Sequence, residues 1–161
     1  MEIKKILWPT DFSSNADAAL EHVKSLSQHH NAEIHVLHVL EDYVHHEGWY
    51  GTFEPDHVAN LMEKARKRAK ERLDQICERH LEGCPLFIKH VAVGDPAQEI
   101  LKLIEEEQVG AVVMATRGGG DYFGFGSVAE KVSKNSSVPV MTVPVEASKE
   151  AGDSKFEVKG M

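Results

Sequence analysis

A glycine-rich stretch at residues 115–127, ATRGGGDYFGFGS, contains the residue types that bind an anion through the backbone. It lies between an apolar run, Ala111–Ala115, and a helical pattern that begins near Ser127. Glycine-rich loops can direct several backbone N–H groups at an anion, and the positive end of the following helix adds to the attraction. The order of strand, loop and helix therefore predicts a phosphate-binding loop. A surface loop whose glycines only permit turns would have the same composition.

Other kinds of chemical site are disfavoured by residue spacing. The chain has no Gly-Lys-Ser/Thr sequence, so it lacks the P-loop used for phosphoryl transfer. Its ten histidines include the pairs His29-His30 and His45-His46, but neither pair has HExxH spacing or an adjacent cysteine pair for zinc. Cys77 and Cys84 form no CxxC pair, and we interpret both as reduced, structural thiols. We expect no catalytic residue and no dedicated metal site.

Size and charge limit the classes of function. A chain of 161 residues, 42% of them hydrophobic, can bury the core of one domain. A net charge of −8 argues against a nucleic-acid binder or a surface for anionic membranes. No apolar run is long enough to span a bilayer, and the N-terminus does not resemble a signal peptide, so we expect a cytoplasmic protein. We expect one domain over residues 1–146 and a disordered polar tail over 147–161.

The elements that must position the glycine loop alternate between strand and helix. Clusters of β-branched and apolar residues predict strands at residues 3–9, 33–40, 86–93, 111–115 and 138–145. Helical periodicity predicts helices at about 14–29, 55–81, 96–109 and 127–134. The inner stripe of the longest helix comprises Val58, Met62, Ala65, Ala69, Leu73 and Ile76. This alternation predicts a parallel sheet with helices on both faces.

Two helix starts have clear capping signals. Asp95 followed by Pro96 and Gln98 fits a cap, a proline at the first helical position and a capping box. At the first helix, Ser14 and Asp17 fit a capping box, and Ser13 is a competing cap. Both helices follow predicted strands, which supports the alternating order.

Ligands of such sheets bind beyond the carboxyl ends of the strands, where the strand order reverses. The loops at that edge are residues 9–14, the segment after Leu40, residues 94–96 and the glycine loop. Asp11 and the glycine loop are thus expected to share one crevice. Residues 41–57 have no periodicity and place Trp49, Tyr50 and Phe53 beside glycines, which indicates a lid or a partner surface. Alternatively, these aromatic residues fold back onto the core.

Six motifs, in order along the chain, resemble those of the universal stress protein family. They are ILWPTDFS at 6–13, VLHV at 36–39, VGDPAQEI at 93–100, VMATRG at 113–118, GSVAEKV at 126–132 and PV at 139–140. The similarity covers residues 2–145. It implies the family's fold, a three-layer αβα sandwich of the Rossmann-like, adenine nucleotide alpha hydrolase-like type, with a five-stranded parallel sheet of order 3-2-1-4-5.

The resemblance to the ATP-binding branch of this family implies a set of site residues. In that branch the aspartate that ends the first strand and a valine near the end of the second hold adenine and ribose. Glycines and a Ser/Thr hold the phosphates, often with a divalent cation such as Mg²⁺ or Mn²⁺. Carried over, the pattern implies ATP binding by Pro9, Thr10, Asp11, Val39, Met114, Ala115, Arg117, Gly118, Gly126, Ser127 and Val128. The implied function is a stress-response or signalling switch with at most slow ATP hydrolysis.

The loop departs from the family pattern Gly-x-x-Gly-x(9)-Gly-(Ser/Thr) in two ways. Ala115 replaces the first glycine, and seven residues instead of nine separate Gly118 from Gly126. The added methyl group is tolerated where φ is negative, but a shorter loop changes the direction of the N–H groups. Three consecutive glycines and Arg117 favour anion binding nonetheless. The alternative is a dimeric stress or interaction module of the same fold that binds no nucleotide.

The last predicted strand indicates an oligomer. Pro139 and Pro144 place the strand at a sheet edge, where a missing N–H interrupts no ladder. An open apolar edge promotes aggregation, and members of the family pair this strand antiparallel across a two-fold axis. We therefore predict a homodimer through Val138–Val145. The expected small partner is an adenine nucleotide, and no nucleic-acid or membrane partner is expected.

Overall fold

The computed structural model describes residues 2–41, 55–80, 86–116 and 125–145. Five parallel strands form one sheet: β1 (Lys5–Pro9), β2 (Glu33–Leu40), β3 (Phe87–Val93), β4 (Ala111–Ala115) and β5 (Val140–Val143). The strand order is β3-β2-β1-β4-β5, which confirms the predicted topology. The predicted tail, most of the 41–57 segment, and Cys84 lie outside the described residues.

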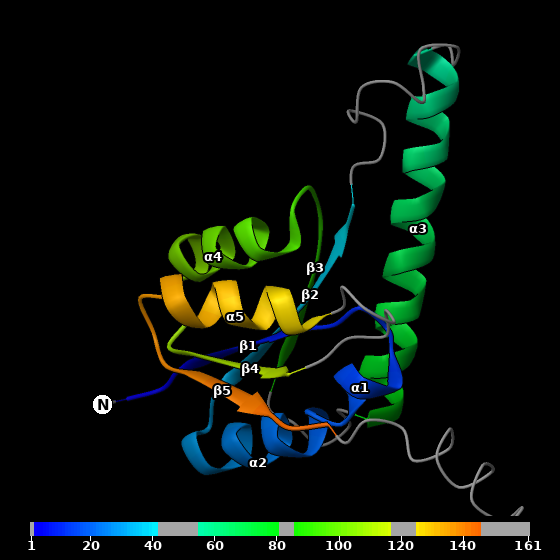
Figure 1. The fold of residues 1–161 in the computed structure, drawn as a ribbon. Helices are drawn as coiled ribbons and strands as arrows, with labels where there is room; N and C mark the ends of the chain where they lie inside the picture. The colour runs from blue at the N-terminus through cyan, green and yellow to red at the C-terminus, as the bar shows by residue number, and fades with distance from the viewer. Residues whose placement is uncertain (1, 42–54, 81–85, 117–124, 146–161) are drawn as a thin grey trace, which may run out of the picture.

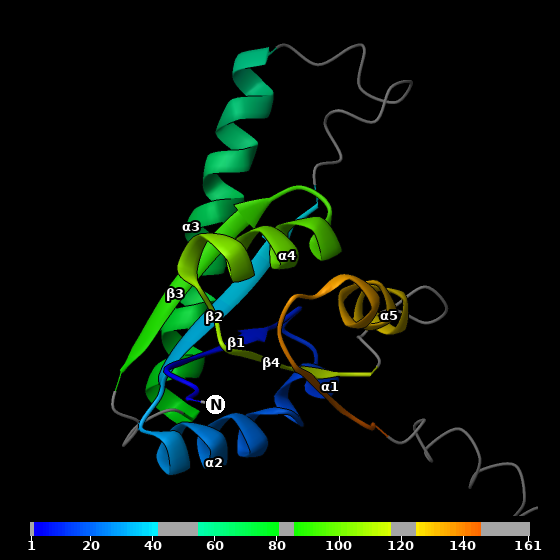
Figure 2. The same ribbon diagram turned by 90° about the vertical axis from the view of Figure 1, so that its left-hand side faces the viewer.

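Helices cover both faces of the sheet, as Figures 1 and 2 show. On one face lie α1 (Ser14–Asp17), α2 (Leu20–His30) and α3 (Pro55–His80); on the other lie α4 (Pro96–Glu107) and α5 (Phe125–Asn135). Each face has its own cluster of buried apolar side chains. Ile6 and Trp8 of β1 belong to the first cluster and Leu7 to the second, so this strand is buried on both faces as its apolar run predicts.

The first helix is not continuous, contrary to the prediction. Ser13, rather than Ser14, is its N-cap, since its side chain accepts a hydrogen bond from the Ala16 N–H. The indole N–H of Trp8 donates to the carbonyl oxygen of Ala16 at 3.2 Å, and the N–H of Ala19 donates to the same oxygen at 3.1 Å. The chain therefore tightens to i→i+3 bonds after Asp17, which separates α1 from α2.

The other element boundaries differ by small amounts that matter for the site. The α5 helix begins at Phe125, two residues before the predicted start, so Gly126, Ser127 and Val128 all lie in its first turn. The β5 strand spans only Val140–Val143 because Pro139 and Pro144 flank it without N–H donors. Its position at the edge of the sheet confirms the prediction for this strand. Asp95 caps α4 as predicted, accepting from the Gln98 N–H at 3.0 Å.

The predicted inner stripe of α3 is fully buried only in the C-terminal half of the helix. Ala69 and Leu73 are buried, and Cys77, one turn further on, joins the same cluster. In the other half, Met62 is half-buried and Leu61 is 52% exposed. Burial raises the pKa of the Cys77 thiol to about 11. This thiol therefore stays protonated at neutral pH, which agrees with a structural role.

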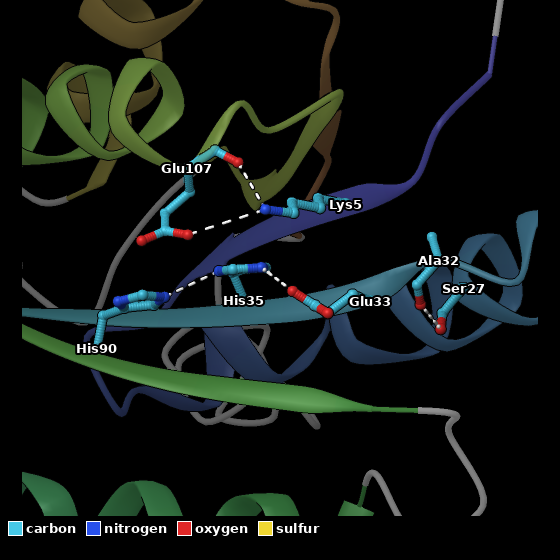
Figure 3. A network of polar contacts seen from close by, with 7 residues as sticks. All are labelled: Lys5, Ser27, Ala32, Glu33, His35, His90 and Glu107. Carbon is cyan, nitrogen blue, oxygen red and sulfur yellow. Dashed lines mark hydrogen bonds and ion pairs between the residues drawn. The ribbon is translucent and has the colours of Figure 1, made fainter.

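A polar network lies between the sheet and the C-terminal end of α4 (Figure 3). His35, which is fully buried, donates through Nε2 to Glu33 at 2.6 Å, because a carboxylate only accepts. Its Nδ1 lies 2.9 Å from Nε2 of His90, and one of these two nitrogens donates to the other. Lys5 donates to the carbonyl oxygen of Glu107 at 3.0 Å, beside this chain of contacts. The buried His35 keeps both of its hydrogen bonds only while one proton is shared between its Nδ1 and Nε2 of His90.

We expect the protein to lose stability as the pH falls below about 6.5, the ordinary histidine pKa. Burial, with His35 adding to it, lowers the pKa of His90, and burial also lowers the pKa of His38. As the pH falls below about 6.5, the unfolded chain binds more protons than the folded one. The contribution of these two histidines to stability is therefore present above that pH and is lost on acidification. Thermal unfolding followed by circular dichroism between about pH 7.5 and 5.5 measures the effect.

His90→Gln should flatten this pH dependence, whereas His22→Gln, which changes an exposed histidine on α2, should leave it intact. An unchanged slope in His90→Gln would contradict the assignment to His90.

Candidate functional site

The two central strands part at their carboxyl ends. The β1–β4 ladder pairs Ile6 with Ala111 and Leu7 with Val112, although both strands run further. From there β1 continues along β2, and the N–H of Thr10 donates to the carbonyl oxygen of Leu37 at 2.8 Å. The β4 strand instead continues along β5 to Ala115, where it pairs with Val143. Because β1 and β4 also lead to helices on opposite faces, this is the switch point of the sheet.

Asp11 lies on the β1 side of the switch point, in a loop ordered by its own side chains. Its Oδ1 accepts from the backbone N–H of Ser13 at 2.9 Å and from the Ser13 hydroxyl. The hydroxyl oxygen of Thr10 accepts from the N–H of Phe12 at 3.0 Å. Phe12 has a φ of 66°, the left-handed conformation that these turns impose. The loop therefore holds the half-buried Asp11 carboxylate at the strand end.

Other predicted site residues lie on the α4–α5 side. Val39, Met114 and Val128 belong to one packed cluster, so β2, β4 and α5 meet there. Met114 and Ala115, at the end of β4, are buried. Pro9 and Thr10, at the end of β1, are buried as well.

The first turn of α5 carries the remaining predicted residues. Ser127 is exposed and Val128 is half-buried. The first four N–H groups of a helix have no partner within it, and they form a partial positive charge. Gly126, in the same turn, has no side chain to cover these groups. Arg117 and Gly118, and with them the central part of the glycine loop, lie outside the described residues.

A stack of three side chains joins this edge to α3, and the sequence did not predict it. The centroid of the Phe12 ring lies 4.1 Å from that of the His38 ring. The guanidinium of Arg72 lies over the same Phe12 ring, 4.2 Å from its centroid. Nδ1 of His38 donates to the carbonyl oxygen of Thr10 at 2.9 Å. The one available signal was His38, a polar residue among the apolar residues at the carboxyl end of β2.

The protonation of His38 depends mainly on burial, which lowers its pKa. The Arg72 charge acts in the same direction, whereas the hydrogen bond to Thr10 and the Asp11 charge oppose it. A neutral His38 still donates to Thr10 through Nδ1. The contact that supports the loop therefore does not require a positive charge.

Within the described ranges, no group of three or more His, Cys, Asp or Glu side chains could hold a metal ion. No helix in those ranges combines the length and the hydrophobicity needed to cross a membrane. His29 is exposed, and its ring contacts the carbonyl oxygen of Ser25. His45 and His46 lie outside the described residues.

Comparison with known proteins identifies similar chains. The model of the Universal stress protein family matches residues 2–144. Universal stress protein MJ0577 of Methanocaldococcus jannaschii is 32% identical over 154 residues, covering 87% of this chain and 94% of that protein. The solved structure of MJ0577 superimposes with a TM-score of 0.76 and covers 92% of this chain and 100% of that one.

Two further solved structures share the fold and were determined with nucleotides. One is a universal stress protein in complex with cAMP, with a TM-score of 0.56 and 19% identity, covering 89% of this chain and 98% of that one. The other is the universal stress protein from Archaeoglobus fulgidus in complex with dAMP, with a TM-score of 0.58 and 21% identity, covering 88% and 98%.

Proposed function

The chain belongs to the universal stress protein family, and we propose that it binds an adenine nucleotide between the carboxyl ends of β1, β2 and β4. The proposed ligand is ATP, with Mg²⁺ or Mn²⁺ as counterion. In this proposal bound ATP acts as a signal of a metabolic or stress state and does not supply energy. The chain contains no P-loop sequence, so ATP hydrolysis is at most slow.

The observation that carries the proposal is the separation of β1 and β4 at the switch point. The Asp11 carboxylate lies on the β1 side, where it can accept from nucleoside hydroxyl or amino groups. The N-terminal turn of α5 follows β4, and the partial positive charge at this end of the helix suits phosphates. Donors for an anion and an acceptor for a nucleoside thus follow the carboxyl ends of two strands that part at the switch point. The cAMP and dAMP complexes of proteins with this fold support adenine as the base.

Calorimetric titration with Mg-ATP tests the proposal. We expect saturable binding, and we expect Ser127→Ala to weaken it about two- to tenfold, the contribution of one hydrogen bond. Ser133→Ala is the matched control, because Ser133 is exposed on the same helix but far from its first turn. This control should bind ATP as the wild type does.

Absence of heat and of a thermal shift at millimolar nucleotide would overturn the proposal. That outcome would favour the second candidate, a dimeric interaction module of the same fold without nucleotide. Two departures from the family pattern favour this candidate: Ala115 replaces the first glycine, and the loop between Gly118 and Gly126 is two residues short. Mass spectrometry of the purified protein, which would detect co-purified adenine nucleotide, gives an independent decision between the two.

We also propose a homodimer formed through β5. This strand pairs with β4 and lies at the edge of the sheet, and its Met141 side chain is 43% exposed. An apolar edge with free backbone groups favours pairing with a second copy. Light scattering at micromolar concentration should give the dimer mass, and Met141→Lys should shift it toward the monomer. The exposed Leu61→Lys on α3 is the control, and a monomeric wild type would contradict the proposal.

A further inference from the structure

A cavity of about 190 Å³ lies between the loop after β1 and the C-terminal half of α3. Its lining residues are Phe12, Asp17, Arg72, Gln75, Ile76, Arg79 and His80. Asp11, Val39 and Ser127 do not line it, so it is a separate site from the proposed nucleotide site. Figure 1 shows how α1 and the lower part of α3 lie beside each other.

Positive side chains dominate the cavity. The α3 residues that line it recur at intervals of three and four, so they form one face of the helix. Two of these residues, Arg72 and Arg79, are arginines. Their guanidinium groups bind the oxygens of anions through paired N–H donors. His80 adds a third nitrogen group. Against these, the lining contains a single carboxylate, that of Asp17. The excess of donors suits a compact oxyanion.

Asp17 adds a selective element. Its Oδ1 is buried, and among the described residues it is the one buried side-chain oxygen or nitrogen without a hydrogen-bond partner. Burial raises the pKa of this carboxyl, the nearby His80 lowers it and Asp11 raises it. A buried acceptor without a donor costs free energy. A ligand that donates an O–H or N–H group to this oxygen would remove that cost.

An anion that carries a hydroxyl group satisfies both requirements at once. At neutral pH inorganic phosphate retains a proton, whereas sulfate, of the same shape and similar charge, has none. We propose that this cavity binds hydrogenphosphate, with Arg72 and Arg79 holding its charged oxygens and Asp17 accepting the hydrogen bond of its P–O–H group. Arg72 already lies against Phe12, beside Asp11, so a bound anion adjoins the edge of the sheet.

Parallel calorimetric titrations with inorganic phosphate and sulfate, at constant ionic strength and neutral pH, test this assignment. We expect phosphate to bind about tenfold or more tightly than sulfate, and Arg79→Gln to weaken phosphate binding by at least about tenfold. Asp17→Asn replaces an acceptor by a group that also donates, so it should reverse the preference toward sulfate. Arg66→Gln, at an exposed position on the same helix, is the control. Circular dichroism verifies the fold of each variant.

Equal affinities for phosphate and sulfate would overturn the proposal, as would phosphate binding that survives Arg79→Gln but falls in Ser127→Ala. The latter result would place the phosphate at the nucleotide site instead. Should Asp17→Asn fail to fold, the phosphate and sulfate affinities of Arg79→Gln and of its control Arg66→Gln still decide the question. A titration with glycerol 3-phosphate tests the role of the P–O–H group: its dianion has none, so it should bind more weakly than phosphate, and equal or tighter binding would exclude the contact to Asp17. Titration with Mg-ATP tests the nucleotide site independently.

Discussion

Replacement of Asp11 by alanine is expected to weaken the binding of Mg-ATP by about 10- to 100-fold, the loss of hydrogen bonds to a charged group. The carboxylate lies at the end of β1, where this strand separates from β4. It also orders its own loop by accepting from Ser13. The variant therefore loses both a nucleoside acceptor and part of the preorganised geometry. Calorimetric titration against the wild type measures the effect.

Two further variants divide this effect into its parts. Asp11→Asn keeps an oxygen that can accept from Ser13 but removes the charge, so its loss of affinity should be smaller than that of alanine. Glu106→Ala removes one carboxylate from an exposed position near the end of α4. This position lies just before the amino end of β4, whereas Asp11 follows the carboxyl end of β1. The Glu106→Ala variant should bind nucleotide as the wild type does. Wild-type affinity in Asp11→Ala would exclude this carboxylate from the site.

Replacement of Trp8 by alanine is expected to lower the free energy of unfolding by about 3–5 kcal/mol. Among the described residues, Trp8 is the largest fully buried side chain, and it lies in the cluster shared by β1, α2 and α3. Its removal leaves a cavity that the surrounding close-packed side chains cannot fill. Urea unfolding followed by circular dichroism measures the change, since this probe does not depend on tryptophan fluorescence.

Trp8→Phe keeps an aromatic ring but loses the indole N–H that donates to Ala16. We expect it to cost about 1–2 kcal/mol, which separates the hydrogen bond and the smaller volume from the full cavity. A cost of less than about 1 kcal/mol for Trp8→Ala would contradict the packing role.

Local patterns in the chain were sufficient for most of the fold. The boundaries of β2 and β4 agree with their apolar runs, and the start of α4 agrees with the capping signal at Asp95. These features depend on neighbouring residues, whose periodicity and hydrogen bonding are written in the sequence itself. The motif resemblance extended this to the strand order, which the sheet confirms.

The long-range contacts were beyond such patterns. The break between α1 and α2 depends on the Trp8 indole, which donates to the Ala16 carbonyl oxygen from a different element. The pairing of His35 with His90 joins residues 55 positions apart. No local pattern reports either contact, because each arises only when packed layers bring distant groups within hydrogen-bonding distance.

For the candidate site, the sequence by itself determined which residue types end β1 and begin α5, and that the strands between them run parallel. The tertiary structure decided that β1 and β4 part after Leu7 and Val112, and that α5 begins at Phe125. It also placed Arg72 over Phe12 and left Oδ1 of Asp17 buried without a hydrogen-bond partner. The physical reason is that hydrogen-bond partners and burial depend on the whole packed chain, whereas residue periodicity depends only on neighbours.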